Sequence, residues 1–177
     1  MHNSDLKPVN FYRIIQKGDN MATKTNAVRL VQQAKISCRE SFYEFDEKDL
    51  NGNHAAAAIG MPPEQVFKTL VARGEKTGIN VFCIPVCCEL DLKKAAKAAG
   101  DKNMEMVAVK DLLSLTGYIR GGCSPVGMKK KYPTYMDETC ILWEEIAVSA
   151  GARGHQMVLP PEDLANLVDA KMADITL

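Results

Sequence analysis

The chain has few of the residues that usually signal metal or histidine chemistry. Only three histidines occur in 177 residues, His2, His54 and His155, and none has the spacing of a catalytic triad or a ligand set. Its six cysteines include no C-x-x-C pair, which argues against the common zinc-site patterns. We therefore expect no metal and no cofactor, and we expect each histidine to be a packing or surface residue.

A long apolar run and a net charge are missing as well. No stretch approaches the ~20 apolar residues of a membrane span, so we expect no membrane partner. Lys plus Arg and Asp plus Glu number 22 each, so any preference for nucleic acid must come from local clusters, and we expect no DNA partner. Free cysteines without a secretory signal predict a cytoplasmic location.

Length and composition predict one domain. With 46% hydrophobic and 25% charged residues, the chain can bury a substantial core, whereas two full domains would be cramped. The segment from Met21 to Lys24 would itself make a plausible start of translation. We therefore expect residues 1–22 to be a poorly ordered extension and residues 23–177 to form the domain.

Apolar periodicity, caps and turn residues predict short helices and strands that do not alternate regularly. The expected helices cover about 26–35, 54–59, 92–99, 110–115 and 161–168. The expected strands cover about 41–45, 68–73, 80–86, 104–109, 134–136, 140–143, 146–149 and 155–159. Such mixing predicts a single α+β domain with a mixed, barrel-like β-sheet core flanked by short helices.

The run from Gly121 to Lys131 concentrates bare backbone and positive charge. Its three glycines let a ligand approach main-chain N–H groups, and its three lysines attract phosphate or carboxylate, which is typical of an anion pocket. The run is not a phosphate-binding P-loop. Met128 occupies the position of the required lysine, and no hydroxyl residue follows until Thr134.

Nor does the run contain a convincing protein nucleophile. A nucleophile elbow needs a glycine two residues after the serine and an N–H on the next residue, but Val126 and Pro125 occupy those positions after Ser124. The Ser124 hydroxyl is expected to bind a ligand or to stabilise the turn. Cys123 has no base near it in sequence and is expected to pack as a small hydrophobe.

Other charged and phenolic residues are candidates for the same pocket. Lys68 stands in an apolar, strand-like segment, where a lysine either extends to solvent or is held for a function. Tyr43 and Asp137 would add a phenol and an acid. For the cluster Lys93, Lys94 and Lys97, a solvated face and a phosphate contact are about equally favoured, whereas the cluster Lys129, Lys130 and Lys131 is expected to contact RNA.

Taken together and in order, several segments resemble a known family. They are Val66–Leu70, Leu90–Ala96, Thr116–Tyr118, Gly121–Gly127, Pro133–Thr134 with Asp137, Ser149–Gly154 and Asp169–Ile175. This set is similar to the YbaK/EbsC family of Cys-tRNA(Pro) deacylases, which are relatives of the editing domain inserted in bacterial prolyl-tRNA synthetase. The likeness runs from about residue 23 to the C-terminus.

The resemblance implies a trans-editing enzyme that removes cysteine from mischarged tRNA(Pro). Cysteine and proline are similar in size, so a synthetase pocket cannot separate them well enough and a second site must discard the error. Its substrate would be the acceptor end of an aminoacyl-tRNA, with prolyl-tRNA synthetase as a further partner. The alternatives are a deacylase for Ala-tRNA(Pro) or another aminoacyl-tRNA, and a non-catalytic binding module of the same fold.

The resemblance also implies roles for individual residues. Lys68 would hold the terminal phosphate or ribose, and N–H groups around Gly121 and Gly122 would stabilise the oxyanion. The attacking group would be the thiol of the bound cysteine, leaving as a thiolactone. The remaining expected substrate contacts are the ammonium-orienting Asp137, the pocket-lining Tyr43, and the turn residues Ser124 and Pro125.

Overall fold

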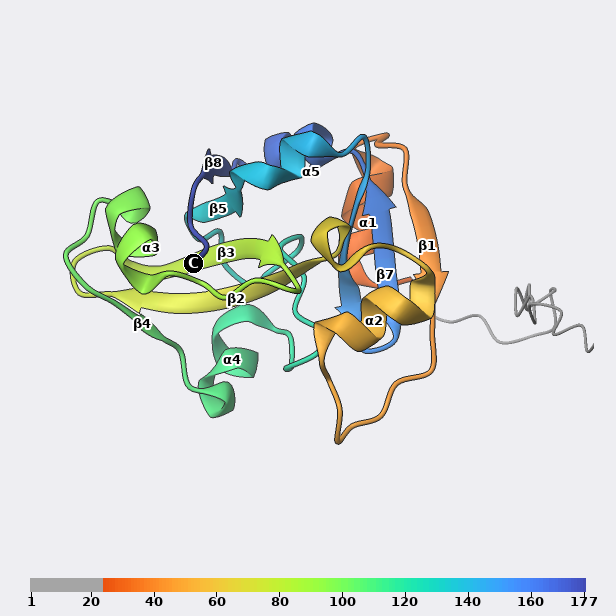
Figure 1. Ribbon diagram of the computed structural model, residues 1–177, viewed down its shortest axis with the longest axis horizontal. Coiled ribbons are helices and arrows are strands. Elements are labelled where there is room, and N and C mark those ends of the chain that lie inside the picture. Colours follow the sequence, from red (N-terminus) through yellow and green to blue (C-terminus); the bar gives the residue numbers. More distant parts are fainter. Residues whose placement is uncertain (1–23) are drawn as a thin grey trace, which may run out of the picture.

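The computed structural model describes residues 24–177, and the expected extension over residues 1–22 lies outside this range. The described part of the chain forms an α+β domain with two β-sheets and short helices around them (Figure 1). The predicted fold class is therefore confirmed. The sheets meet at a parallel bridge between Val66 and Ala147, so the core is built on two joined sheets.

The smaller sheet is antiparallel, with the order β1 (Arg39–Phe42), β7 (His155–Leu159), β6 (Ile146–Ala152). Strand β1 starts and ends earlier than predicted because only Arg39 to Phe42 pair with β7. Beyond it, the Tyr43 N–H donates to the Gly154 carbonyl at 2.9 Å. This bond brings Tyr43 beside the β6–β7 turn.

The larger sheet is mixed. Its order is β4 (Met104–Met106), β2 (Phe67–Gly74), β3 (Gly78–Pro85), β5 (Thr134–Asp137), β8 (Lys171–Ala173). The predicted β2–β3 hairpin is confirmed, and the Asp101 carboxylate accepts the N–H groups of Lys76 and Thr77 in its turn. Strand β4 pairs only with Ala72 to Gly74, which leaves the first half of β2 with an open edge.

Local side-chain bonds explain where several elements begin. Helix α3 (Leu92–Ala99) has the predicted bounds because Asp91 accepts the N–H groups of Lys93 and Lys94. The strand predicted over 140–143 is wrong. Asp137 accepts the Thr139 N–H and starts the 3-10 helix η2 (Glu138–Leu142) instead.

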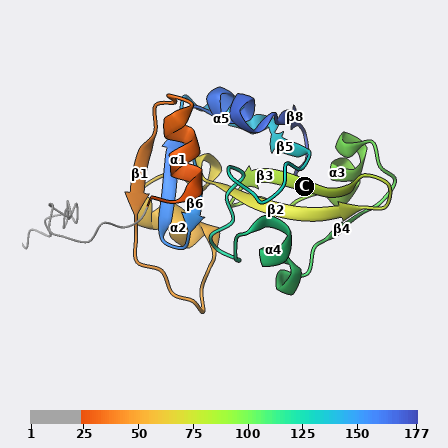
Figure 2. The ribbon, with the colours of Figure 1, turned by 180° about the vertical axis from the view of Figure 1, so that it is seen from behind.

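The remaining helices cover the sheets from different sides (Figures 1 and 2). They are α1 (Asn26–Gln33), α2 (Gly52–Ile59), the 3-10 helix η1 (Pro63–Gln65), α4 (Val109–Thr116) and α5 (Pro161–Val168). Helices α1 and α5 pack on the main hydrophobic core with β6 and β7, whereas α3 covers a second core on the larger sheet. None of the helices described has the length and apolar character that crossing a bilayer requires.

Candidate active site

A cleft of about 840 Å³ opens between α2, the first half of β2, α4 and the turn that contains Gly121. The connections after β1 and between β6 and β7 complete its wall. Three of the predicted site residues line it, namely Tyr43, Lys68 and Gly121. The fold thus brings together residues that are up to 78 positions apart in the sequence.

Lys68 is half-buried at the open edge of β2. Its ammonium nitrogen lies 3.5 Å from the Val86 carbonyl and 3.8 Å from Glu89 Oε1, and 27% of its side chain is exposed. An ammonium group has three N–H donors; the contact with Val86 is a long, weak hydrogen bond, and the contact with Glu89 is an ion pair beyond hydrogen-bond distance. The Lys68 cation is therefore held at the cleft with donor capacity left for an anionic or polar ligand.

The two neighbouring glycines, Gly121 and Gly122, differ in the hydrogen bonding of their backbone N–H groups. Gly121 has φ +86°, lines the cleft and offers a backbone N–H that has no hydrogen-bond partner within residues 24–177. Gly122 is buried and donates its N–H to the Ile119 carbonyl at 3.0 Å. Of the predicted pair of oxyanion donors, only Gly121 keeps a free N–H, because the turn already uses that of Gly122.

Gly122 is nevertheless required by packing. A Cβ atom at this position would lie 3.1 Å from the backbone carbon of Ala152 and 3.1 Å from the backbone nitrogen of Arg153. The glycine turn is therefore pressed directly against the end of β6. This close approach sets the distance between the Gly121 wall of the cleft and the β6–β7 turn.

Ser124 and Pro125, both predicted to contact substrate, are buried and do not line the cleft. The Ser124 hydroxyl accepts the Val126 N–H at 3.2 Å. Of the two roles that the sequence left open for Ser124, the structure therefore favours stabilisation of the turn. Pro125 shapes the same turn from inside the protein.

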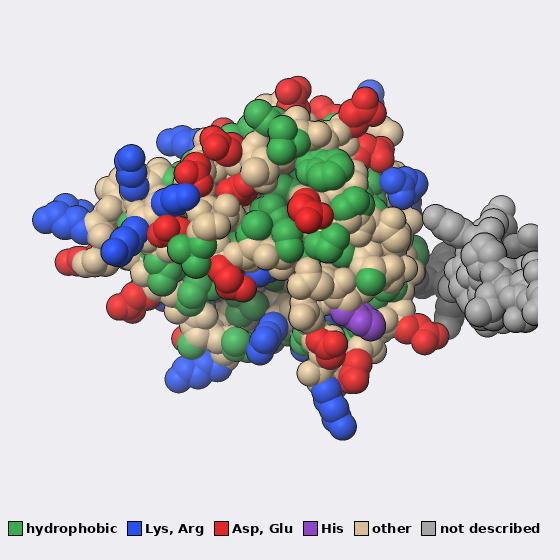
Figure 3. Space-filling model, in the orientation of Figure 1, with side chains coloured by type: hydrophobic (Ala, Val, Ile, Leu, Met, Phe, Trp, Pro, Cys, Tyr) green, Lys and Arg blue, Asp and Glu red, His purple; other side chains and the backbone are tan. Residues whose placement is uncertain are grey.

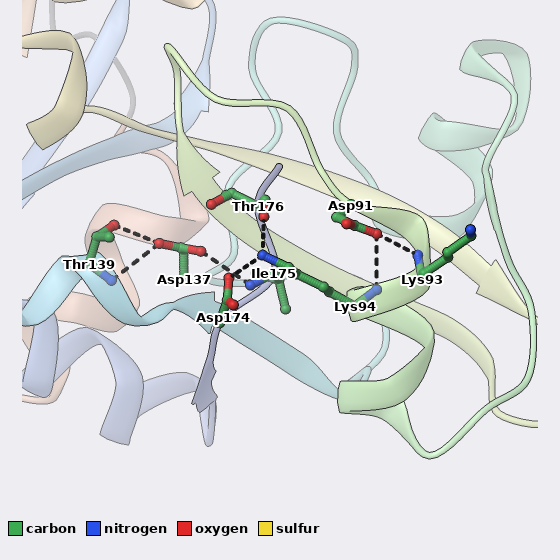
Figure 4. Close-up of polar contacts among 8 residues, drawn as sticks. All are labelled: Asp91, Lys93, Lys94, Asp137, Thr139, Asp174, Ile175 and Thr176. Carbon is green, nitrogen blue, oxygen red and sulfur yellow. Dashed lines mark hydrogen bonds and ion pairs between the residues drawn. The ribbon is translucent and has the colours of Figure 1, made fainter.

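Asp137 does not line the cleft, so the structure gives no support for its predicted contact with the substrate ammonium. The residue is 1% exposed at the end of β5. One carboxylate oxygen accepts the Thr139 N–H and hydroxyl, and the other accepts the Ile175 N–H at 3.3 Å (Figure 4). Asp137 is a structural acceptor that ties the C-terminal segment to the larger sheet.

The predicted RNA-contacting lysines lie away from the cleft. Lys94 is tied to Asp174 at 2.9 Å and to the Thr176 carbonyl at 2.7 Å (Figure 4), and Lys131 lies 3.5 Å from Asp169. The other three, Lys93, Lys129 and Lys130, are exposed. Figure 3 shows Lys and Arg side chains gathered at its left end, over α3 and the β2–β3 hairpin. Contact of these lysines with RNA stays a prediction.

Positive charge reaches the cleft from residues that the sequence did not single out. Lys48, Arg120 and Arg153 line it together with Lys68, against the carboxylates of Asp49 and Glu89. This excess of cations suits a polyanionic ligand. Arg120 directly precedes Gly121, so its position beside the glycine run could have identified it as a residue of the site. The others come from distant segments, and only the fold reveals their convergence.

Gln156 on β7 was also missed. It lines the cleft at 6% exposure, and its side-chain oxygen is buried without a hydrogen-bond partner among the described residues. A buried amide in this state has unused hydrogen-bonding capacity, and such groups need an explanation in a native structure. Strand alternation could place Gln156 on one face of β7 but could not show that this face borders a cleft.

Cys123 lines the cleft but is a poor nucleophile. It is 8% exposed and packs with Val71 and Tyr118. Burial raises the pKa of the Cys123 thiol to about 12, so at neutral pH the group is protonated. Its predicted packing role agrees with this environment. Within residues 24–177, no three His, Cys, Asp or Glu side chains come close enough together to hold a metal ion.

Comparison with known proteins assigns the chain to a family. The model of the aminoacyl-tRNA editing domain matches residues 52–167. A protein of Enterococcus faecalis named "Putative Cys-tRNA(Pro)/Cys-tRNA(Cys) deacylase EbsC" is 48% identical over 153 residues, which cover 86% of this chain and 93% of that protein. The chain therefore belongs to the aminoacyl-tRNA editing domain family, and it is an editing enzyme by this membership.

Other relatives agree with the fold. The uncharacterised protein YwhH of Bacillus subtilis is 25% identical over 129 residues, covering 73% of this chain and 82% of that protein. A crystal structure described as that of a "putative trans-editing enzyme for prolyl tRNA synthetase" matches with a TM-score of 0.72 and 28% identity, covering 85% of this chain and 97% of that one. The structure of hypothetical protein APE2540, at 20% identity and a TM-score of 0.76, supports the fold alone.

Proposed function

We propose that this protein removes cysteine from Cys-tRNA(Pro), using the cleft as the site that receives the aminoacylated 3′ end. The observation that carries the proposal is that Lys68 and Gly121, whose N–H has no hydrogen-bond partner among the described residues, line the same cleft. An ester bound between them would have a cation for its ribose or phosphate and a donor for its carbonyl oxygen. The family membership and the name of the E. faecalis relative support this substrate.

The attacking group is the thiol of the bound cysteine. Among the described histidines, His155 contacts Glu40, and His54 lines the cleft without a side-chain hydrogen bond, so no hydroxyl or thiol of the cleft is hydrogen-bonded to a histidine. Cys123 is kept protonated by burial. A substrate that carries its own thiol does not need a protein nucleophile, which suits this cleft.

The proposed step balances without water. The substrate sulfur forms a bond to the ester carbonyl carbon, and the carbonyl oxygen becomes an oxyanion that accepts the Gly121 N–H. The bond between the carbonyl carbon and the ribose oxygen then breaks, and that oxygen takes up the proton that the thiol gives up. Cysteine leaves as a thiolactone, and the tRNA keeps a free 3′-terminal ribose. Alanyl and prolyl esters lack the thiol and cannot follow this route.

Prolyl-tRNA synthetase is the proposed partner and the cytoplasm the proposed location. The balanced charges of the chain predict modest, salt-sensitive binding of tRNA, so selection of tRNA(Pro) is left to a protein that already holds it. The name of the structural relative at 28% identity links that relative to prolyl-tRNA synthetase, which supports this partner. The free thiols among the described residues fit a reducing compartment.

A deacylation panel tests the proposal. Wild-type protein is mixed with Cys-tRNA(Pro), Cys-tRNA(Cys), Ala-tRNA(Pro) and Pro-tRNA(Pro), and release of each amino acid is followed against the uncatalysed rate. We expect Cys-tRNA(Pro) to be cleared about 100-fold faster than Ala-tRNA(Pro), because only the first carries the reacting thiol. Pro-tRNA(Pro) should remain charged.

Each other outcome has a distinct meaning. Turnover of no ester would indicate a binding module, and faster release of alanine than of cysteine would indicate an Ala-tRNA(Pro) deacylase. Equal clearance of both cysteinyl tRNAs would show that the free enzyme reads the amino acid but not the tRNA. That result would leave the choice of tRNA to a partner, whereas selective tight binding of tRNA(Pro) by the free protein would make the partner unnecessary.

A further inference from the structure

The peptide unit between Arg120 and Gly121 is held from one side by a distant arginine. Nε of Arg153 donates to the Arg120 carbonyl at 2.9 Å, across 33 positions of sequence. The described residues contain no cis peptide bond, so the Arg120 C=O and the Gly121 N–H lie in one plane and point in opposite directions. Fixing this carbonyl therefore fixes the direction of the Gly121 N–H.

Arg153 is itself well anchored. It occupies the short turn between β6 and β7, where Gly154 has φ +72°, and its backbone nitrogen packs against Gly122. Its Nη1 lies 3.5 Å from Glu47 Oε1, and 23% of its side chain is exposed. An anchor built on the end of a strand holds a donor more precisely than a long loop does.

The charge of Arg153 adds a second effect. A hydrogen bond from a guanidinium to a carbonyl is charge-assisted and stronger than a neutral one. Such a bond polarises the amide and makes its N–H a better donor, because linked hydrogen bonds reinforce one another. Removing Arg153 would thus leave the Gly121 N–H both less ordered and less acidic.

We propose that Arg153 is a positioning residue that orients and polarises the Gly121 N–H toward the ester carbonyl. The inference rests on the proposed deacylase function, since it deepens the role of that same site. It differs from a direct contact between Arg153 and an RNA phosphate. Such a contact would act on binding of the tRNA and on its salt dependence, whereas orientation of an oxyanion donor acts on the chemical step.

Steady-state deacylation of Cys-tRNA(Pro) by the full chain separates the two roles. We expect Arg153→Ala to lower kcat by about 10- to 100-fold, somewhat less than loss of an oxyanion donor itself, with KM changed less than about threefold. Arg153→Lys keeps the charge but not the planar Nε donor, so it should lose kcat as well. Added methylguanidinium should partly restore kcat of Arg153→Ala.

Arg39→Ala is the matched control, because Arg39 pairs with Glu145 on the surface and does not line the cleft. It should leave kcat and KM unchanged. Wild-type kcat in Arg153→Ala, a raised KM at unchanged kcat, or wild-type kcat in Arg153→Lys would each overturn the inference.

A readout that does not need turnover separates this inference from the proposed function. The Gly121 amide resonance should shift and become more mobile in Arg153→Ala than in Arg39→Ala, as measured by ¹⁵N NMR. An unchanged resonance would overturn the inference even if the enzyme is active. Absence of wild-type turnover would contradict the proposed function alone.

Discussion

Replacing Lys68 by methionine should lower kcat/KM for Cys-tRNA(Pro) by about 100-fold, which is about 2.7 kcal/mol of transition-state stabilisation. Methionine keeps most of the apolar stem and removes the charge, so the fold should tolerate it. The cation that it removes is the one held weakly by the Val86 carbonyl and Glu89 at 3.5 and 3.8 Å. The N–H donors of the Lys68 ammonium are the groups proposed to bind the 3′ end of the substrate.

A lysine outside the cleft provides the comparison. Lys76 is exposed in the β2–β3 turn and bonds to Asp101 only through its backbone N–H, so Lys76→Ala should keep both activity and stability. Rates should be measured under single-turnover and steady-state conditions, with thermal unfolding of each variant. If Lys68→Met retained more than half of the wild-type kcat/KM, Lys68 would have no part in the site.

Gly121→Ala is expected to have the second large effect, a loss of kcat of the order of 100-fold. At φ +86° an L-residue is strained by about 1–2 kcal/mol. The added Cβ would also lie 3.1 Å from both methyl carbons of Leu50. Relief of this strain by rotation or shift of the turn would redirect the N–H that is proposed to bind the oxyanion.

Gly100→Ala separates the loss of geometry from the loss of stability. Gly100 has φ +72° at the end of α3, a Cβ there would meet no atom within 4 Å, and the residue lies outside the cleft lining. Both variants should therefore unfold at lower temperature, but only Gly121→Ala should lose kcat. Equal activity of the two, when each is folded at the assay temperature, would show that the Gly121 N–H is not used.

The sequence was informative about the fold wherever the signal was local. Helix α3 has its predicted bounds because Asp91 and Gly100 cap it, and the β2–β3 hairpin follows from its polar turn. The sequence was uninformative about β8, a three-residue strand that exists only through parallel pairing with β5. The apolar segment 140–143 was misassigned because its turn depends on the Thr139 N–H, which donates to the side chain of Asp137.

The contrast between local signals and long-range contacts also explains which residues of the site could be found from the sequence. Lys68, Tyr43 and Gly121 were found from the resemblance and from unusual local composition, and the cleft contains them. Asp137 does not line the cleft, and a sequence cannot show that its carboxylate already accepts three hydrogen bonds inside the protein. Arg153 was missed because a sequence does not show which distant group its side chain contacts. Its contact with the Arg120 carbonyl joins segments that only the packing of the glycine turn on β6 brings together.

The most direct test of the central claim, that the substrate supplies its own nucleophile, is the rate of release from 2-aminobutyryl-tRNA(Pro) compared with Cys-tRNA(Pro). The two aminoacyl groups are nearly the same size, and they differ by a methyl in place of the thiol. We expect the enzyme to clear Cys-tRNA(Pro) with a thiolactone as the first product and to leave the 2-aminobutyryl ester at its uncatalysed rate. Release of both at similar rates, with free amino acid as the first product, would show that water attacks and would contradict the claim.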